Sequence, residues 1–210
     1  MSVALTNSAS LTRPLRGFEG IRRYFDNAER AWIAQVLPGD YYVTVQPEVI
    51  TTVLGSCVST CLRDPDVGIA GLNHFMLPNQ GSSAVESGEA LRYGCFAVER
   101  LINELVKHGA RRERLEIKIF GGGKVIAGMS DIGRKNIDFI HEYFETEGLR
   151  IAAEDVGGTW ARRVRYHAES GRVMIQRLQT QEASEVVRSE TALQRSLSIA
   201  PPRGEVDLFD

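Results

Sequence analysis

Residues 50–78 read ITTVLGSCVSTCLRDPDVGIAGLNHFMLP, and this stretch decides how the chain can fold. Residues 57–62 and 69–76 are rich in β-branched and apolar side chains, which favour β-strands. Residues 64–68, between them, read DPDVG. Proline presets φ, aspartate closes local turns and glycine accepts positive φ, so this segment predicts a tight turn. The whole stretch therefore predicts an antiparallel β-hairpin.

The predicted hairpin places a thiol beside an imidazole. If the turn is centred between Pro65 and Asp66, Cys57 lies directly opposite His74. Opposed residues on one face of a sheet have Cβ atoms about 4.5–5.5 Å apart, which allows the two side chains to meet. A slip of one residue would move His74 to the other face of the sheet. We therefore expect Cys57 and His74 to form a pair.

Such a pair has the chemistry of a thiol nucleophile and its base. A cysteine attacks as the thiolate, and a free thiol titrates near about 8.5, so Cys57 needs a neighbouring base. His74 would take the thiol proton and later return it to the leaving group. The alternative is a structural cysteine on a buried strand with a hydrogen-bonded core histidine, and residue types alone favour that alternative.

Nearby polar groups offer the remaining parts of a catalytic site. Thr51 and Thr52 are hydroxyls that could orient the histidine ring. Backbone N–H groups around Ser56 and Cys57 could stabilise a developing oxyanion, with help from the side chain of Ser56 or Asn73. The sequence does not choose among these donors.

A metal site is a second use for the same residues. It would group Cys57 and His74 with Cys61 and with Cys95. A strand rises about 3.3 Å per residue, so Cys57 and Cys61 would lie roughly 13 Å apart. Zinc–sulfur bonds of about 2.3 Å cannot bridge that separation. The hairpin therefore argues against metal, and Cys61 and Cys95 are expected to be packing residues.

Two further motifs suggest other ligands and are given structural roles instead. Residues 121–124 read GGGK, but Val125 follows, so the phosphate-loop pattern is incomplete and a close backbone approach is expected. The arginine-rich runs at 111–114 and 162–165 are expected to be solvated faces.

Periodicity and turn residues outline the rest of the chain as an α+β domain with mixed sheets and two main amphipathic helices. Part of residues 21–37 is expected to form a short helix. Residues 1–34 are assigned to a partly disordered extension, 35–180 to the domain, and 181–210 to a polar tail outside the core. The expected strands are 41–46, 50–54, 115–120, 149–156, 162–167 and 172–178, and the expected helices are 94–108, 131–147 and, within the tail, 182–197.

Composition excludes several classes of protein. The 210 residues carry a net charge of −2, which argues against a nucleic-acid-binding field. The sequence has no apolar run of membrane-spanning length, so no membrane insertion is expected. Three cysteines in no framework pattern suit a reducing cytoplasm.

Six short motifs in this order resemble the CheD family of chemoreceptor glutamine deamidases, over roughly residues 35–180. Several such motifs in order are more specific than any one of them. They are LGSCV at 54–58, NHFMLP at 73–78, RYG at 92–94, KIFGGG at 118–123, IGRKN at 132–136 and DVGG at 155–158.

The resemblance implies a fold like the catalytic domain of the cytotoxic necrotizing factor deamidases. It implies a catalytic Cys57 and His74, with Thr51 as the third member. The implied reaction is hydrolysis of glutamine side chains on methyl-accepting chemotaxis receptors, without a metal or organic cofactor. A CheC-type phosphatase is implied as a further partner. Two alternatives remain: another thiol enzyme, such as a methylesterase or transglutaminase, or a non-catalytic chemotaxis module that binds receptors or the phosphatase.

Overall fold

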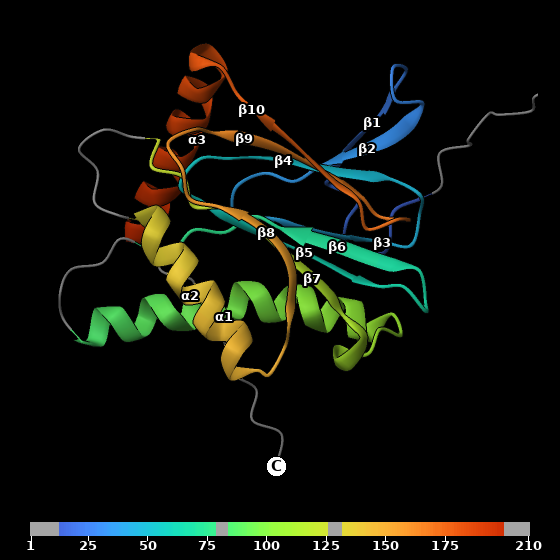
Figure 1. The fold of residues 1–210 in the computed structure, drawn as a ribbon, viewed down its shortest axis with the longest axis horizontal. Helices are drawn as coiled ribbons and strands as arrows, with labels where there is room; N and C mark the ends of the chain where they lie inside the picture. Colours follow the sequence, from blue (N-terminus) through green and yellow to red (C-terminus); the bar gives the residue numbers. More distant parts are fainter. Residues whose placement is uncertain (1–12, 79–83, 126–131, 200–210) are drawn as a thin grey trace, which may run out of the picture.

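Two five-stranded sheets, three α-helices and a short 3₁₀ helix (Arg112–Arg114) make up the regular structure of the described part of the chain, residues 13–78, 84–125 and 132–199 of a computed structural model (Figure 1). The expected α+β class is confirmed. The first sheet has the order β1-β2-β4-β9-β10, with bounds Arg22–Asp26, Ala31–Gln35, Val49–Leu54, Arg162–His167 and Val173–Arg177. The second has the order β3-β6-β5-β7-β8, with bounds Tyr41–Thr44, Ile69–Asn73, Val58–Asp64, Glu116–Gly121 and Ile151–Val156.

The second sheet lies in the middle of the molecule. Helices α1 (Ala84–Lys107) and α2 (Ile132–Thr146) cover one of its faces, and the first sheet lies over the other (Figure 1). Because both faces are covered, every residue of β6 is buried and β5 is buried at all but one position. Residue 131, expected at the start of α2, lies outside the described residues.

The third helix, α3 (Thr180–Ile199), stands at the end of the first sheet (Figure 1). The sequence assigned this segment to a tail outside the core. Val186, Glu190 and Leu197 are nevertheless buried, with 8%, 1% and 6% of their surface exposed. The described part of the tail is therefore packed on the domain. None of the described helices is both long enough and apolar enough to cross a bilayer.

The prediction of a short helix within residues 21–37 is wrong. Residues 22–26 and 31–35 form β1 and β2, which pair antiparallel, and β2 continues parallel to β4. Their aromatic and β-branched residues favour strands, and this local preference outweighs the irregular apolar spacing that suggested a helix. The described part of the predicted N-terminal extension thus completes the first sheet.

The predicted hairpin forms, but with a different register. Asp64 pairs with Ile69 and Cys61 with Leu72, because the loop contains all four residues 65–68. Cys57 and His74 are therefore not directly opposed, and that expectation is wrong by two positions. A two-residue shift keeps a side chain on the same face, so the predicted encounter of Cys57 and His74 is not lost.

Candidate active site

Cys57 and His74 meet at the seam between the two sheets. The chain leaves β4 in the first sheet, turns through residues 55–57, and enters β5 in the second. His74 follows β6 directly. Both side chains are buried, and the Cys57 sulfur, a His74 ring nitrogen and a carboxylate oxygen of Glu190 lie within 4.8 Å of one another.

The cysteine turn, residues 55–57, is held in place by hydrogen bonds to its three carbonyl oxygens. Gly123 donates its N–H to the Gly55 oxygen at 2.6 Å, and Gly122 donates to the Cys57 oxygen at 2.7 Å. The Asn136 amide on α2 donates to the Ser56 oxygen at 2.8 Å. With the carbonyls held, the N–H groups of residues 55–57 point the other way, into the site.

The glycine run therefore makes a close backbone approach, as its sequence predicted, rather than a phosphate loop. Gly121 has φ of 110°, and a Cβ on it would overlap the carbonyl oxygen of Cys57. A side chain there would both strain the backbone and push the cysteine turn out of place.

We expect Gly121→Ala to lower the free energy of unfolding by about 3 kcal/mol, because strain and overlap add. Gly68→Ala is the matched control, since Gly68 also has positive φ (67°) but open space around it. That control should lose only about 1 kcal/mol. Urea unfolding measures the free energy of unfolding of both variants. Equal losses would show that the close contact between Gly121 and the Cys57 carbonyl does not contribute to stability.

Thr52, not Thr51, contacts the histidine ring. The Thr52 hydroxyl lies 2.7 Å from Nδ1 of His74, whereas the Thr51 hydroxyl donates to the Val164 carbonyl at 2.9 Å. Successive residues of a strand face opposite sides, so Thr51 and Thr52 cannot both reach His74. The contact expected of Thr51 is therefore made by its neighbour.

This contact defines which nitrogen of His74 carries the proton. Thr52 has one hydroxyl proton, and its hydroxyl donates to the Val36 carbonyl at 2.9 Å. Toward His74 the Thr52 oxygen must then accept, so Nδ1 is the protonated nitrogen. Nε2 is left as a buried acceptor without a hydrogen-bond partner among the described residues. Burial lowers the pKa of His74 to about 4, which leaves the ring neutral and able to accept a proton.

We expect Thr52→Val to reduce turnover about 10- to 100-fold, because the ring loses the acceptor that fixes its tautomer. Thr51→Val is the matched control on the same strand and should change turnover less than about threefold. Steady-state kinetics of both variants at one pH measures this difference. A larger loss for Thr51→Val would reverse the assignment of the two hydroxyls.

Glu190 is a site residue that the sequence did not reveal. Its carboxylate accepts the N–H groups of Gly55 at 2.7 Å, Ser56 at 2.8 Å and Cys57 at 3.1 Å, and the Ser56 hydroxyl at 2.7 Å. The turn thus presents a cluster of donors to one negatively charged group, which is the arrangement of an oxyanion hole. Ser56 was predicted to contribute here, and both its N–H and its hydroxyl face the cluster.

The electrostatics of this arrangement keep the thiol protonated. Burial raises the pKa of Cys57 well above its ordinary value, and the adjacent negative charge of Glu190 raises it further. With Glu190 in place, sulfur and imidazole therefore face each other as neutral groups.

Other residues singled out from the sequence have structural roles. Asn73 accepts the N–H and hydroxyl of Thr60, each at 2.8 Å, and donates to the Ala97 carbonyl at 3.1 Å, so its amide joins β6 to β5 and α1. Arg162 is fully buried, and its guanidinium binds the carbonyls of Asp155 and Gly157. The expectation of a wholly solvated arginine face at 162–165 is wrong at Arg162.

Cys57, His74 and Glu190 also have the donor types of a zinc site. The two carboxylate oxygens of Glu190 already accept four hydrogen bonds from the cysteine turn. This is the arrangement of a carboxylate held by N–H and O–H donors, not that of a carboxylate that binds a metal ion.

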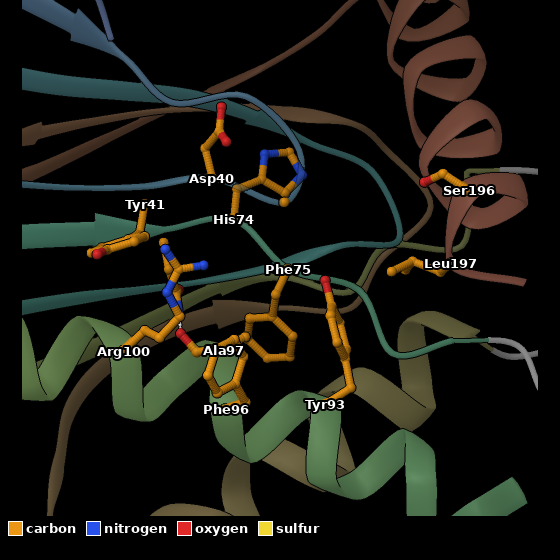
Figure 2. Close-up of a pocket in the computed structure, with 12 residues that line it drawn as sticks. Asp40, Tyr41, His74, Phe75, Tyr93, Phe96, Ala97, Arg100, Ser196 and Leu197 are labelled. Carbon is orange, nitrogen blue, oxygen red and sulfur yellow. Dashed lines mark hydrogen bonds between the residues drawn. The ribbon is translucent and has the colours of Figure 1, made fainter. Parts of the chain in front are cut away.

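Two hollows flank His74. The larger, about 400 Å³, lies between α1 and the end of α3 and is lined by Tyr93, Arg100 and Leu197 among others (Figure 2). The smaller, about 190 Å³, lies on the other side and is lined by residues that include Thr52, Val186 and Glu190. Helix α3 contributes to both, so the two hollows are parts of one surface that α3 crosses.

Fold and site together define an α+β protein with a cysteine–histidine pair and backbone donors, as acyl transfer to sulfur requires. A family model described as CheD chemotactic sensory transduction matches residues 76–177. Probable chemoreceptor glutamine deamidase CheD of Hahella chejuensis is 45% identical over 194 residues, covering 91% of this chain and 92% of the relative. The protein of the same name from Cupriavidus metallidurans is 48% identical, with 90% and 89% covered.

The chain belongs to the CheD family. The Halorhodospira halophila relative, 44% identical with 93% of both chains covered, carries the same name. Among solved structures, Bacillus licheniformis hypothetical protein YfiH matches with a TM-score of 0.28 at 17% identity, covering 49% of this chain and 33% of that one. That match is too weak to inform the fold.

Proposed function

We propose that this protein hydrolyses the side-chain amide of specific glutamines on methyl-accepting chemotaxis receptors, yielding glutamate and ammonia. One observation carries the proposal. The Cys57 sulfur and the His74 ring lie together beside three backbone N–H groups that converge on a single carboxylate. The relatives' name, chemoreceptor glutamine deamidase, supplies the substrate class.

Acylation follows from this geometry. His74 accepts the thiol proton on Nε2, and the Cys57 sulfur attacks the amide carbon. The carbonyl oxygen becomes negative and is received by the N–H groups of residues 55–57 and the Ser56 hydroxyl. The carbon–nitrogen bond then breaks, the nitrogen takes the proton from Nε2, and ammonia leaves. A thioester between Cys57 and the substrate remains.

Deacylation repeats the sequence with water. Nε2 accepts a proton from water while the water oxygen attacks the thioester carbon. The carbon–sulfur bond breaks, the proton returns to sulfur, and the product is a glutamate side chain. Losing one oxyanion donor typically lowers turnover about 10²–10³-fold, so the donor cluster accounts for a large part of catalysis. Thr52 orients the ring without contributing charge, so the imidazolium is transient.

The cellular setting is part of the proposal. The substrate glutamines lie on cytoplasmic receptor helices, so the protein acts in the cytoplasm and meets its substrate at an open surface. A CheC-type phosphatase is a further proposed partner, suggested only by membership of the family.

Peptide mass spectrometry of a receptor cytoplasmic fragment tests the function. After incubation with the protein, defined glutamines should show the mass increase for replacement of NH₂ by OH. Adding a primary amine should leave the product unchanged, whereas incorporation of the amine would identify a transglutaminase. Loss of receptor methyl esters without deamidation would identify a methylesterase. A panel of receptor fragments that all bind but stay unmodified would instead support a non-catalytic binding module.

A further inference from the structure

Helix α3 lies across the candidate active site with one face buried. Among the α3 residues whose burial is described, Val186, Glu190 and Leu197 are buried, and Leu193 is partly buried against the main core. Their positions, separated by four, three and four residues, fall on a single helical stripe. The stripe begins in the smaller hollow beside His74 and ends in the larger one. The surface beneath α3 is therefore a groove that accepts an α-helix.

The central residue of this stripe is a glutamate placed at the reacting atoms. Its carboxylate fills the donor cluster of residues 55–57 and approaches the Cys57 sulfur and the His74 ring. A glutamate side chain on a helix is also what the proposed reaction leaves when it deamidates a receptor glutamine. The position of Glu190 is thus the position expected for the product.

We propose that α3 occupies the substrate groove as an internal product analogue, with Glu190 standing for the glutamate that the enzyme makes. The proposal rests on the proposed function and specifies its substrate. The target is a glutamine on one face of an α-helix, with an apolar residue four positions before it and others three and seven positions after it. A receptor helix must displace α3 to be modified.

A catalytic role for Glu190 fits the contacts less well. A carboxylate that assists a catalytic histidine accepts the ring N–H that faces away from the nucleophile. In this site Nδ1 of His74 is paired with Thr52, and both oxygens of Glu190 are held by the cysteine turn. A negative charge there opposes thiolate formation, so it maintains a resting state.

The most direct test replaces Glu190, the product analogue, with glutamine, the residue type of the substrate. Glu190→Gln places an amide where the carboxylate lies, and the enzyme is expected to hydrolyse it, so the purified protein should contain glutamate at a position encoded as glutamine. Trypsin releases residues 189–195, which also contain the native Gln194 as an internal control. Loss of ammonia without gain of water, trapped as a thioester to Cys57, would equally support the proposal.

Two matched variants make the result specific. Glu190→Gln combined with Cys57→Ser should keep its glutamine, because the nucleophile is absent. Glu185→Gln places an amide at an exposed position of the same helix and should also stay unmodified. Conversion at position 185 or 194 would show spontaneous deamidation and overturn the proposal.

Displacement of the helix is tested with Glu190→Ala. This variant should modify the receptor fragment and react with iodoacetamide at Cys57 at least about tenfold faster than the wild type, because the groove and the donor cluster are released. Arg188→Ala should match the wild type in both rates, because Arg188 is exposed on the same helix and lines neither hollow. A slower receptor reaction in Glu190→Ala would make Glu190 part of the catalytic machinery and overturn the proposal.

The outcomes separate this inference from the proposed function. Receptor deamidation by the wild type, with glutamine retained at position 190 of Glu190→Gln, would overturn the inference alone. Conversion at position 190 without modification of any receptor would support the inference and reject receptors as the substrate. Absence of both reactions would reject both.

Discussion

Replacing Cys57 with serine is expected to lower the rate of receptor deamidation at least about 10⁴-fold, because the step that forms the thioester is lost. Serine is close in size to cysteine and fits the same buried turn. Its hydroxyl is much harder to deprotonate than a thiol, and a neutral His74 does not make it a comparable nucleophile. The measurement is the rate at which defined receptor glutamines gain the mass of glutamate.

Cys95→Ser is the matched control for this change. Cys95 lies on α1 and is half-buried, so its replacement tests the loss of a thiol without touching the site. We expect that variant to keep the wild-type rate, and we expect both variants to unfold at similar urea concentrations. A Cys57→Ser protein that still deamidates at more than about one per cent of the wild-type rate would exclude Cys57 as the nucleophile.

Replacing His74 with glutamine is expected to lower turnover about 10²- to 10⁴-fold, because the group that moves the proton between sulfur, nitrogen and water is removed. The same substitution should change how stability depends on pH. His74 has a pKa of about 4 in the folded protein because it is buried. An unfolded histidine titrates near about 6.5.

The sign of this effect follows from where the proton binds better. Between about pH 6.5 and pH 4 the unfolded chain binds a proton at His74 and the folded chain does not, so acid favours unfolding. At pH 5 this difference removes about 2 kcal/mol of stability that is present at pH 7. Urea unfolding at both pH values should show a loss for the wild type that exceeds the loss for His74→Gln by about that amount.

His141→Gln is the control for turnover, since His141 is partly exposed on α2 and paired with Glu154. It should keep the wild-type turnover. If His74→Gln lost as much stability as the wild type on acidification, His74 would not be the buried neutral group that the structure places beside Cys57.

The sequence predicted the parts of the site that local chemistry determines. The turn residues 64–68 and the flanking β-branched runs were enough to predict the hairpin and the encounter of Cys57 with His74. The register could not be predicted to better than two positions, because it depends on how many residues the loop keeps out of the ladder. The choice between Thr51 and Thr52 failed for a related reason: it depends on which face of β4 meets the second sheet.

Glu190 lay beyond prediction because its partners are more than 130 residues away. A helix was expected within 182–197, and α3 forms there. The low hydrophobicity of the segment, however, indicated a solvated tail, and nothing local distinguishes Glu190 from the other glutamates of α3. Arg162 was misjudged likewise, since the other arginines of the run, Arg163 and Arg165, are more exposed and the burial of Arg162 depends on its contacts with the loop around Gly157.

The buried, protonated state of Cys57 has a consequence for the lifetime of the enzyme. Peroxide oxidises the thiolate, and an exposed thiolate can proceed from sulfenic acid to forms that cells cannot reduce. Cys57 has no exposed surface, and its pKa is raised by burial and by Glu190. The contacts that hold α3 in place therefore also shield the sulfur from oxidants, so that an idle molecule stays chemically intact until a substrate helix arrives.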